Sequence, residues 1–271
     1  MFSDRGTYLA SAGRDGMAVI WDPATLTQTD AIQHRARVRD IAFASMGNET
    51  YLATASFDCT AIVLSLQSGD RRSIDARPID DAEDCPADSQ FNSVSFNEDG
   101  SRLLLTRNFE FDVVDSNVLF AGDSAQPNRI YRTGLPNKVT YARFDSQGDI
   151  IYAGLRGIRG RFFLGTQAAA PFRPQSTSIQ RIELSANGTL LFSIDEFGEF
   201  RVTDLDSDTD LFWFLLDFDP DRRTSHFENN VVVDYDLACI PGAYSCVLAT
   251  PLGTTGRVAL YLIEPEIEEE G

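Results

Sequence analysis

The chain has 271 residues, of which 41 are acidic and 23 are basic, so its formal net charge is −18. A hydrophobic content of 43% and an aromatic content of 11% exclude a solvated low-complexity chain. The acidic excess argues against a broad nucleic-acid-binding surface, because such a surface clusters Lys and Arg against the phosphates. A local basic patch is still compatible with this composition.

The sequence has no obvious targeting or membrane segment. Residues 1–5 contain no apolar core of signal-peptide length, and the most compact apolar run, residues 211–216, is far shorter than the ~20 residues that span a bilayer. The chain has four scattered cysteines, none in a C-x-x-C pair: Cys59, Cys85, Cys239 and Cys246. This pattern favours free thiols in a reducing compartment over a disulfide framework or a zinc site. We therefore predict a soluble intracellular protein without membrane association.

One pattern recurs six times along the chain: an apolar residue, a polar turn with a glycine, and a second apolar run. The six glycines, 41, 53, 48, 40 and 54 residues apart, are Gly6, Gly47, Gly100, Gly148, Gly188 and Gly242. Asp, Asn and Gly supply a turn that tolerates positive φ, and the flanking apolar runs favour strands. Each copy therefore predicts a β-hairpin.

Four copies continue through a second turn into a third predicted strand, at residues 17–22, 60–65, 199–204 and 257–264. No stretch of a dozen residues shows sustained helical periodicity. Short strands repeated at intervals of 40 to 54 residues predict an all-β β-propeller over residues 1–264. Residues 265–271 are predicted to be an acidic C-terminal stub.

The first copy lacks most of its expected inner strand, since only Met1 precedes Phe2. The sequence therefore predicts about six recognisable blades, the first incomplete. A shortened seven-bladed ring, a ring completed by a partner's strands and an open ring all fit this pattern. We favour the shortened chain, because an uncovered blade edge is a pairing hazard.

Part of the first copy resembles the signature of WD-repeat proteins: Asp15, Gly16, Trp21 and Asp22. In that family a loop histidine bonds to a turn aspartate, and the resemblance places His34 and Asp58 in these positions. Both residues are then structural rather than catalytic. Other copies have lost the Trp-Asp pair, which is replaced by Leu64-Ser65, Thr203-Asp204 and Ile263-Glu264. The array is therefore divergent.

The order of the copies resembles one group more closely, the retinoblastoma-binding protein five (Swd-one) subunits of COMPASS-type (MLL or SET-one) histone methyltransferase complexes. The similar segments are 2–22, 66–70, 142–154, 179–184, 200–204 and 259–264, whereas 103–120 matches poorly. That family has a seven-bladed propeller and a C-terminal tail that engages the other core subunits. Neither the seventh blade nor the tail has a counterpart here.

The resemblance implies a non-catalytic scaffold in the nucleus, within a chromatin complex that methylates lysine four of histone H3. Its implied partners are a SET-domain methyltransferase with its companion subunits and the nucleosome with its histones. The alternative is a WD-repeat adaptor in another assembly, such as an RNA-processing, coat or pore complex. An enzyme, for example a propeller hydrolase, is the third class.

Little in the sequence favours catalysis. The chain has only two histidines, His34 and His226, and no legible Ser-His-Asp pairing or phosphate-binding glycine motif. The glycine-rich segment 154–160 is interpreted as a widened turn between two strands. We therefore predict no enzyme activity, no catalytic residue, no cofactor and no small-molecule substrate.

Two acidic stretches raise the question of metal or partner binding. Alternating aspartates at 204–210 look like the start of a calcium loop, but the EF-hand needs Gly at its sixth position and Glu at its twelfth. Counting from Asp206, these positions hold Leu211 and Asp217. We predict no metal site there, only a solvated connection between blades. Residues 75–88 form a second predicted acidic loop, with binding of a basic histone tail as the alternative to a solubilising role.

One apolar segment and one group of arginines are candidate contact sites. Residues 211–216 are predicted to be the outermost strand of the fifth blade, buried on its neighbours, and the alternative is an exposed docking ridge around Trp213. In the resembled family, arginines of the later blades meet nucleosomal DNA. The corresponding candidates for a small basic spot are Arg201, Arg222, Arg223 and Arg257.

Overall fold

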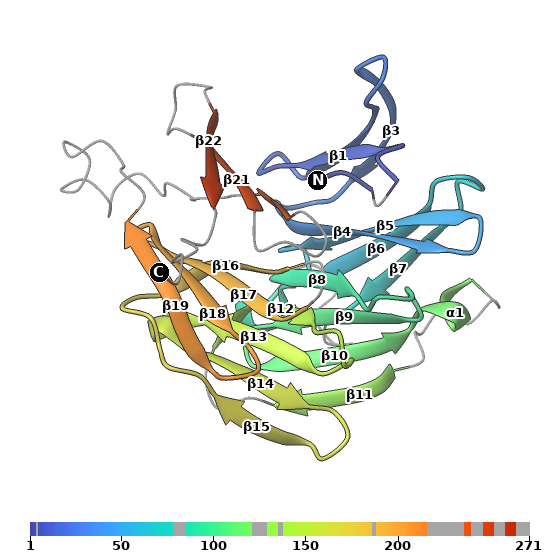
Figure 1. Ribbon diagram of the computed structural model, residues 1–271. Helices are drawn as coiled ribbons and strands as arrows, with labels where there is room; N and C mark the ends of the chain where they lie inside the picture. The colour runs from blue at the N-terminus through green and yellow to red at the C-terminus, as the bar shows by residue number, and fades with distance from the viewer. Residues whose placement is uncertain are drawn as a thin grey trace. The chain divides into compact units, whose positions relative to one another are not determined.

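The computed structural model describes residues 1–3, 5–77, 85–120, 129–134, 138–185, 188–215, 236–239, 246–251 and 258–263 (Figure 1). Regular structure in these ranges is almost entirely antiparallel β-sheet. The exceptions are one short helix, α1 (Ser116–Leu119), and two 3-10 turns, Ala87–Ser89 and Leu155–Gly157. Within the described ranges, no helix is both long enough and apolar enough to cross a membrane.

The described strands form six sheets, each built from strands that are consecutive in the sequence. The first three sheets comprise β1 (Leu9–Ala12), β2 (Met17–Asp22) and β3 (Thr27–Gln33); β4 (Val38–Met46), β5 (Glu49–Ser56), β6 (Thr60–Ser65) and β7 (Arg71–Asp75); and β8 (Ser93–Phe96), β9 (Arg102–Arg107), β10 (Glu110–Asp115) and β11 (Arg129–Gly134).

The last three sheets comprise β12 (Val139–Phe144), β13 (Ile150–Gly154), β14 (Arg159–Phe163) and β15 (Ala168–Pro171); β16 (Ile179–Leu184), β17 (Leu190–Asp195), β18 (Glu199–Asp204) and β19 (Thr209–Leu215); and β20 (Asp236–Cys239), β21 (Cys246–Pro251) and β22 (Val258–Ile263). Repetition of one antiparallel unit confirms the predicted all-β fold with six blades, the first of which has three strands.

The chain divides into two compact units. The first consists of Met1–Leu155 and Gly160–Pro171, and the second of Arg156–Arg159 and Phe172–Gly271. The first three sheets belong to the first unit, and the fifth and sixth belong to the second.

The predicted hairpin turns contain glycines in the left-handed region, as the turn chemistry requires. Five of the six repeat glycines have φ between +64° and +81°: Gly6, Gly47, Gly100, Gly148 and Gly188. The sixth, Gly242, lies outside the described residues. At Gly100 the turn is also crowded, since a Cβ would lie 2.6 Å from Cγ of Met46. A larger residue there would strain the backbone and collide with its neighbour.

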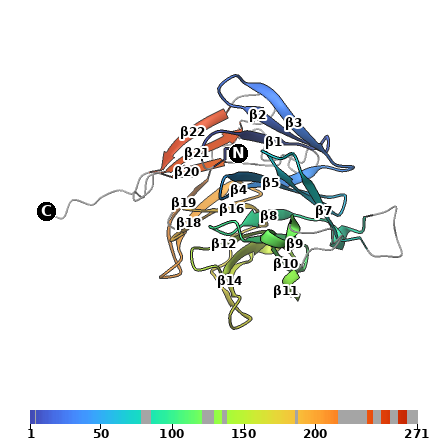
Figure 2. The same ribbon diagram turned by 90° about the vertical axis from the view of Figure 1, so that its right-hand side faces the viewer.

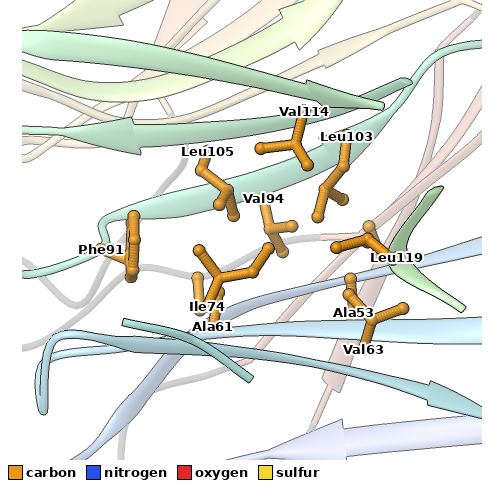
Figure 3. Close-up of a cluster of buried hydrophobic side chains, with 12 residues drawn as sticks. Ala53, Ala61, Val63, Ile74, Phe91, Val94, Leu103, Leu105, Val114 and Leu119 are labelled. Carbon is orange, nitrogen blue, oxygen red and sulfur yellow. The ribbon is translucent and has the colours of Figure 1, made fainter. Parts of the chain in front are cut away.

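The core of the first unit lies between the faces of successive sheets. Figure 3 shows the layer between the second and third sheets, where Ile74 and Val63 pack toward Val94, Leu103 and other side chains that are at most 8% exposed. A similar layer between the first and second sheets includes Ile20 and neighbouring apolar side chains. Burial of these faces drives the sheets together.

The first strands of the second, third and fourth sheets, β4, β8 and β12, lie side by side (Figure 2). Buried polar contacts join them: the Asp40 carboxylate accepts hydrogen bonds from the Val94 N–H at 3.1 Å and from Nη1 of Arg143 at 3.0 Å. The Ala142 N–H donates to the Ser93 hydroxyl at 3.0 Å. One carboxylate thus links three consecutive sheets, as expected for inner strands of a propeller.

The cysteines require a correction. Cys59 and Cys85 form a disulfide, with their Cα atoms 5.6 Å apart, so the prediction of free thiols is wrong for this pair. The two residues are 26 positions apart in the sequence. Folding brings them together: Cys59 lies in the β5–β6 turn, and residues 85–86, which precede β8, lie beside it. Spacing alone cannot reveal this proximity.

Candidate docking site on the fifth sheet

Of the WD-like residues of the first copy, Asp15 and Gly16 lie in the β1–β2 turn, and Trp21 and Asp22 end β2. Asp15 Oδ1 accepts a hydrogen bond of 3.0 Å from the backbone N–H two residues on, and Gly16 follows with a φ of +81°. Trp21 donates its indole N–H to the Ser11 hydroxyl at 3.0 Å. Asp22 accepts hydrogen bonds from backbone N–H groups in the next turn, and these lower its pKa. These contacts organise turns and join two strands within the first sheet.

His34, in the β3–β4 connection, and Asp58, in the β5–β6 turn, belong to one buried network. His34 Nδ1 lies 3.2 Å from Asp58 Oδ2 and 3.0 Å from the Thr60 hydroxyl, and Nε2 lies 2.8 Å from the Thr54 hydroxyl. The Arg35 N–H donates to the same aspartate at 2.9 Å. Burial alone would raise the pKa of Asp58, but hydrogen bonds from His34, Thr60 and Arg35 hold it well below its usual range. Both ring nitrogens are therefore engaged within the fold.

The predicted basic spot is not assembled in the described part of the chain. Three of its four members lie outside that part: Arg222, Arg223 and Arg257. The fourth, Arg201, is 9% exposed and pairs with Glu199 and with Asp210 at 2.8 Å, and its role as a contact residue stays a prediction. Arg201 is on β18, which β17 and β19 flank, and its guanidinium turns toward acidic side chains of its own sheet.

The last strand of the fifth sheet, β19, carries a surface pocket of about 440 Å³. Its lining residues are Arg173, Arg201, Asp210, Leu211, Phe212 and Trp213. The predicted outer strand is confirmed, but its expected burial is wrong at two positions, since Leu211 is 51% and Trp213 61% exposed. These two side chains correspond to the alternative, an exposed apolar ridge.

A β-bulge gathers these residues at one place. Thr203 is opposite Asp210 and Val202 is opposite Phe212, so Leu211 is the extra residue on β19. In a regular strand, Asp210 and Leu211 would point to opposite faces. The bulge bends the strand and redirects its side chains, and four consecutive residues, 210–213, line the same pocket.

Beneath the pocket lies a buried arginine that the sequence did not single out. Arg159 is 1% exposed, and its guanidinium donates to the Thr203 hydroxyl at 2.6 Å, to Asp210 Oδ1 at 3.1 Å and to the Arg173 carbonyl at 2.6 Å. Burial lowers the pKa of Arg159, and the charge of Asp210 opposes this shift. The only sequence signal for this residue was its place in the glycine-rich segment 154–160, which the structure shows as the predicted turn between β13 and β14.

Asp210 in the pocket lining is held in its charged form by neighbouring groups. Burial favours the neutral form of Asp210, but the hydrogen bond from Thr203 and the charges of Arg159 and Arg201 outweigh burial and lower its pKa. The carboxylate is therefore ionised at neutral pH and held between two guanidinium groups. Arg173, which also lines the pocket, is exposed. The pocket therefore presents the guanidinium of Arg173 and the apolar side chains of Leu211 and Trp213 to solvent.

Two of the aspartates at 204–210, Asp204 and Asp210, form hydrogen bonds within this sheet. Asp204 accepts hydrogen bonds from the Asp206 N–H at 3.0 Å and the Ser207 N–H at 2.8 Å, which closes the β18–β19 turn. The segment therefore lies within one sheet, and its prediction as a connection between blades is wrong. Among the described residues, no group of three His, Cys, Asp or Glu is placed to hold a metal ion.

Comparison with known proteins agrees with this architecture. Residues 1–22 match the family model "WD domain, G-beta repeat". No curated protein matches the chain. Among solved structures, the chain is similar to "Structure of U3-55K", with a TM-score of 0.71, 14% identity, and coverage of 92% of this chain and 73% of that one.

A second similar structure is "Crystal structure of RRP9 WD40 repeats", with a TM-score of 0.71, 15% identity, and coverage of 92% of this chain and 72% of that one. Identities this low bear on the fold alone. Together with the repeated antiparallel sheets and the turn residues of the first copy, these similarities show that the chain folds as a WD40-type β-propeller.

Proposed function

We propose that the chain is a non-catalytic scaffold or adaptor that binds a partner protein at the β19 pocket. The observation that carries this proposal is the exposure of Trp213 and Leu211 beside Arg173, on a floor fixed by the Arg159–Asp210 ion pair. Trp and Arg are the residues that most often anchor protein interfaces. A rigid sheet that holds them in place lowers the entropic cost of binding.

The pocket also indicates the chemistry of its partner. Leu211 and Trp213 offer apolar contact, and the exposed guanidinium of Arg173 favours a carboxylate. In the described part of the chain, β19 is the last strand of its sheet. An extended segment with an apolar side chain next to an acidic one therefore suits this site, because backbone pairing along the edge can supplement the side-chain contacts.

The more specific hypothesis is a COMPASS-type complex that methylates lysine four of histone H3, with a SET-domain methyltransferase and the nucleosome as partners and the nucleus as location. Its support is the resemblance of short segments such as 142–154 and 200–204. In this proposal the chain positions its partners, while the chemistry belongs to another subunit. A WD-repeat adaptor in another multiprotein assembly is the alternative.

Affinity capture with three forms of the full chain tests the proposal. Wild type, Trp213→Ala and the control Phe197→Ala are each used as bait, and bound proteins are quantified by mass spectrometry. Phe197 is suitable as a control because it is 50% exposed but does not line the pocket. We expect Trp213→Ala to lose a defined set of proteins that Phe197→Ala retains.

The identity of the lost proteins separates the hypotheses. A SET-domain protein and its companions support the COMPASS-type assembly, and coat or polyadenylation factors support the alternative. Identical sets of proteins on all three baits would contradict the docking role of the pocket.

A further inference from the structure

The turn between β18 and β19 exposes a serine hydroxyl. Residues 206–209 at the tip of this turn are all exposed. They include Ser207 and Thr209, whose hydroxyl oxygens are 2.7 Å apart. The Ser207 hydroxyl also donates to Asp204 Oδ1 at 2.9 Å. Oγ of Ser207 is therefore a nucleophilic atom that a modifying enzyme can reach from solvent.

The turn between β2 and β3 has the same local structure and provides an internal comparison. In it Thr25, which is also exposed, takes the place of Ser207. In each turn an aspartate three residues earlier accepts the backbone N–H of this residue, at 3.3 Å and 2.8 Å. In each turn the next residue also has a left-handed φ, +56° at Leu26 and +53° at Asp208. The two hydroxyl groups therefore occupy equivalent positions in two copies of one turn.

The two turns differ in charge. Ser207 lies between Asp206 and Asp208, whereas Thr25 lies between Ala24 and Leu26. Protein kinases select their substrates partly by the charge pattern around the acceptor, and a basic substrate cleft favours an acceptor with carboxylates on both sides. The β18–β19 turn therefore suits an acidophilic kinase, and the β2–β3 turn does not.

The β18–β19 turn leads directly into the β19 pocket. Thr209 begins β19, and the next four residues, 210–213, line the pocket. Burial lowers the pKa of Arg159 beneath the pocket, and the charge of Asp208, like that of Asp210, opposes this shift. A charge at the tip of the turn therefore acts on the groups that form the pocket.

We propose that an acidophilic serine/threonine kinase phosphorylates Ser207 and that the phosphate weakens the binding of acidic partners at the β19 pocket. Oγ of Ser207 forms a bond to the γ-phosphorus of ATP, the bond from that phosphorus to the β–γ bridging oxygen breaks, ADP leaves, and the hydroxyl proton passes to the kinase. The phosphate carries about −1.5 to −2 charges at pH 7 and repels a carboxylate that approaches Arg173. The regulation rests on the proposed function of the pocket, whereas the phosphorylation does not.

A kinase assay on the full chain tests the modification. Wild type, Thr25→Ser and the double variant Asp206→Asn with Asp208→Asn are each incubated with ATP and an acidophilic kinase, casein kinase two. The phosphate at each position is then quantified by mass spectrometry. Thr25→Ser is the matched control, because both turns then present a serine and differ only in their neighbours.

We expect phosphate at Ser207 and none at position 25 in either form. The double variant should be labelled about tenfold more slowly, as the loss of two exposed charge contacts would give. No phosphate at Ser207, or equal labelling of both turns in Thr25→Ser, would overturn the modification.

Fluorescence quenching of Trp213 measures the effect on the pocket without any partner. The chain has two tryptophans, so Trp21→Phe leaves Trp213, which is 61% exposed, as the single emitter. Strand geometry places Trp213 about 13 Å along the chain from Thr209, well within the Debye length of about 30 Å at 0.01 M salt. The anionic quencher iodide is compared with neutral acrylamide on the unmodified chain, the phosphorylated chain, Ser207→Glu and the control Thr25→Glu.

We expect phosphate at Ser207 to lower iodide quenching about 1.5-fold to twofold at 0.01 M salt and to leave acrylamide quenching unchanged. Ser207→Glu should give a smaller decrease and Thr25→Glu none. Unchanged iodide quenching after phosphorylation would overturn the regulation. Failure of the docking function itself appears elsewhere, as an unchanged set of proteins captured by Trp213→Ala, so the two failures are distinguishable.

Discussion

Asp40 provides the sharpest test of how the sheets are held together. Its side chain is 1% exposed, and that of its partner Arg143 is 9% exposed. The carboxylate also accepts the Val94 N–H, so a single group links strands of three sheets. We predict that Asp40→Ala strongly reduces the free energy of unfolding of the first unit.

The expected magnitude follows from burial. Removing one partner of a buried ion pair leaves the other charge uncompensated, which costs about 3–5 kcal/mol, and the orphaned Val94 N–H makes this a lower bound. The control is Asp30→Ala, because Asp30 pairs with Arg71 at a similar distance of 2.8 Å but the two side chains are 40% and 45% exposed. An exposed pair contributes at most about 1 kcal/mol.

Equilibrium urea denaturation of the full chain, followed by circular dichroism, measures both losses. The double variant Asp40→Leu with Arg143→Met is added, since replacing both charges by apolar groups should recover part of the stability lost in Asp40→Ala. A loss of stability in Asp40→Ala no larger than that in Asp30→Ala would contradict the role of the buried ion pair. A double variant less stable than Asp40→Ala would contradict it as well.

Three further predictions concern single contacts. In urea denaturation, Gly100→Ala should lower the free energy of unfolding by about 2–3 kcal/mol and Gly148→Ala by about 1 kcal/mol. Both glycines have positive φ, but only Gly100 is crowded by a neighbouring side chain. Equal losses in the two variants would contradict the effect of crowding. The pKa of Asp58 is lower in the folded state, so its carboxylate stabilises the fold fully above the unfolded-state pKa of 3.8, and this stabilisation is lost as pH falls below 3.8. The difference in free energy of unfolding between wild type and Asp58→Asn should therefore shrink from about pH 5 to pH 2. A constant difference would be contrary evidence. Reductant should lower the stability of wild type by about 3 kcal/mol through the Cys59–Cys85 disulfide but leave Cys59→Ser nearly unaffected, as thermal denaturation would show.

The sequence predicted the hairpins because their determinants are local. At Gly100 and Gly148, an Asp or Asn cluster and a residue that tolerates positive φ specify the turn, and the flanking apolar residues specify the strands. The repeat spacing then predicted stacked sheets. Such patterns require no knowledge of distant contacts.

The side-chain environment of the candidate site was much less predictable. The apolar residues around Trp213 predict a buried strand. The β-bulge at Leu211 interrupts the regular alternation of side chains along this strand, which the sequence does not reveal. Arg159 looks like a residue of a surface turn, yet its guanidinium meets Asp210, 51 positions away. The Cys59–Cys85 pair was missed for the same reason, since tertiary folding creates it.

Site-specific photo-crosslinking is the most direct test of whether β19 carries a docking site for a partner protein. A photoreactive phenylalanine analogue is placed at position 213 in the full chain, and at position 197 as the control. We expect discrete crosslinks to partner proteins from position 213 that are absent from position 197. The same crosslinks from both positions, or none from position 213, would contradict a docking site on β19.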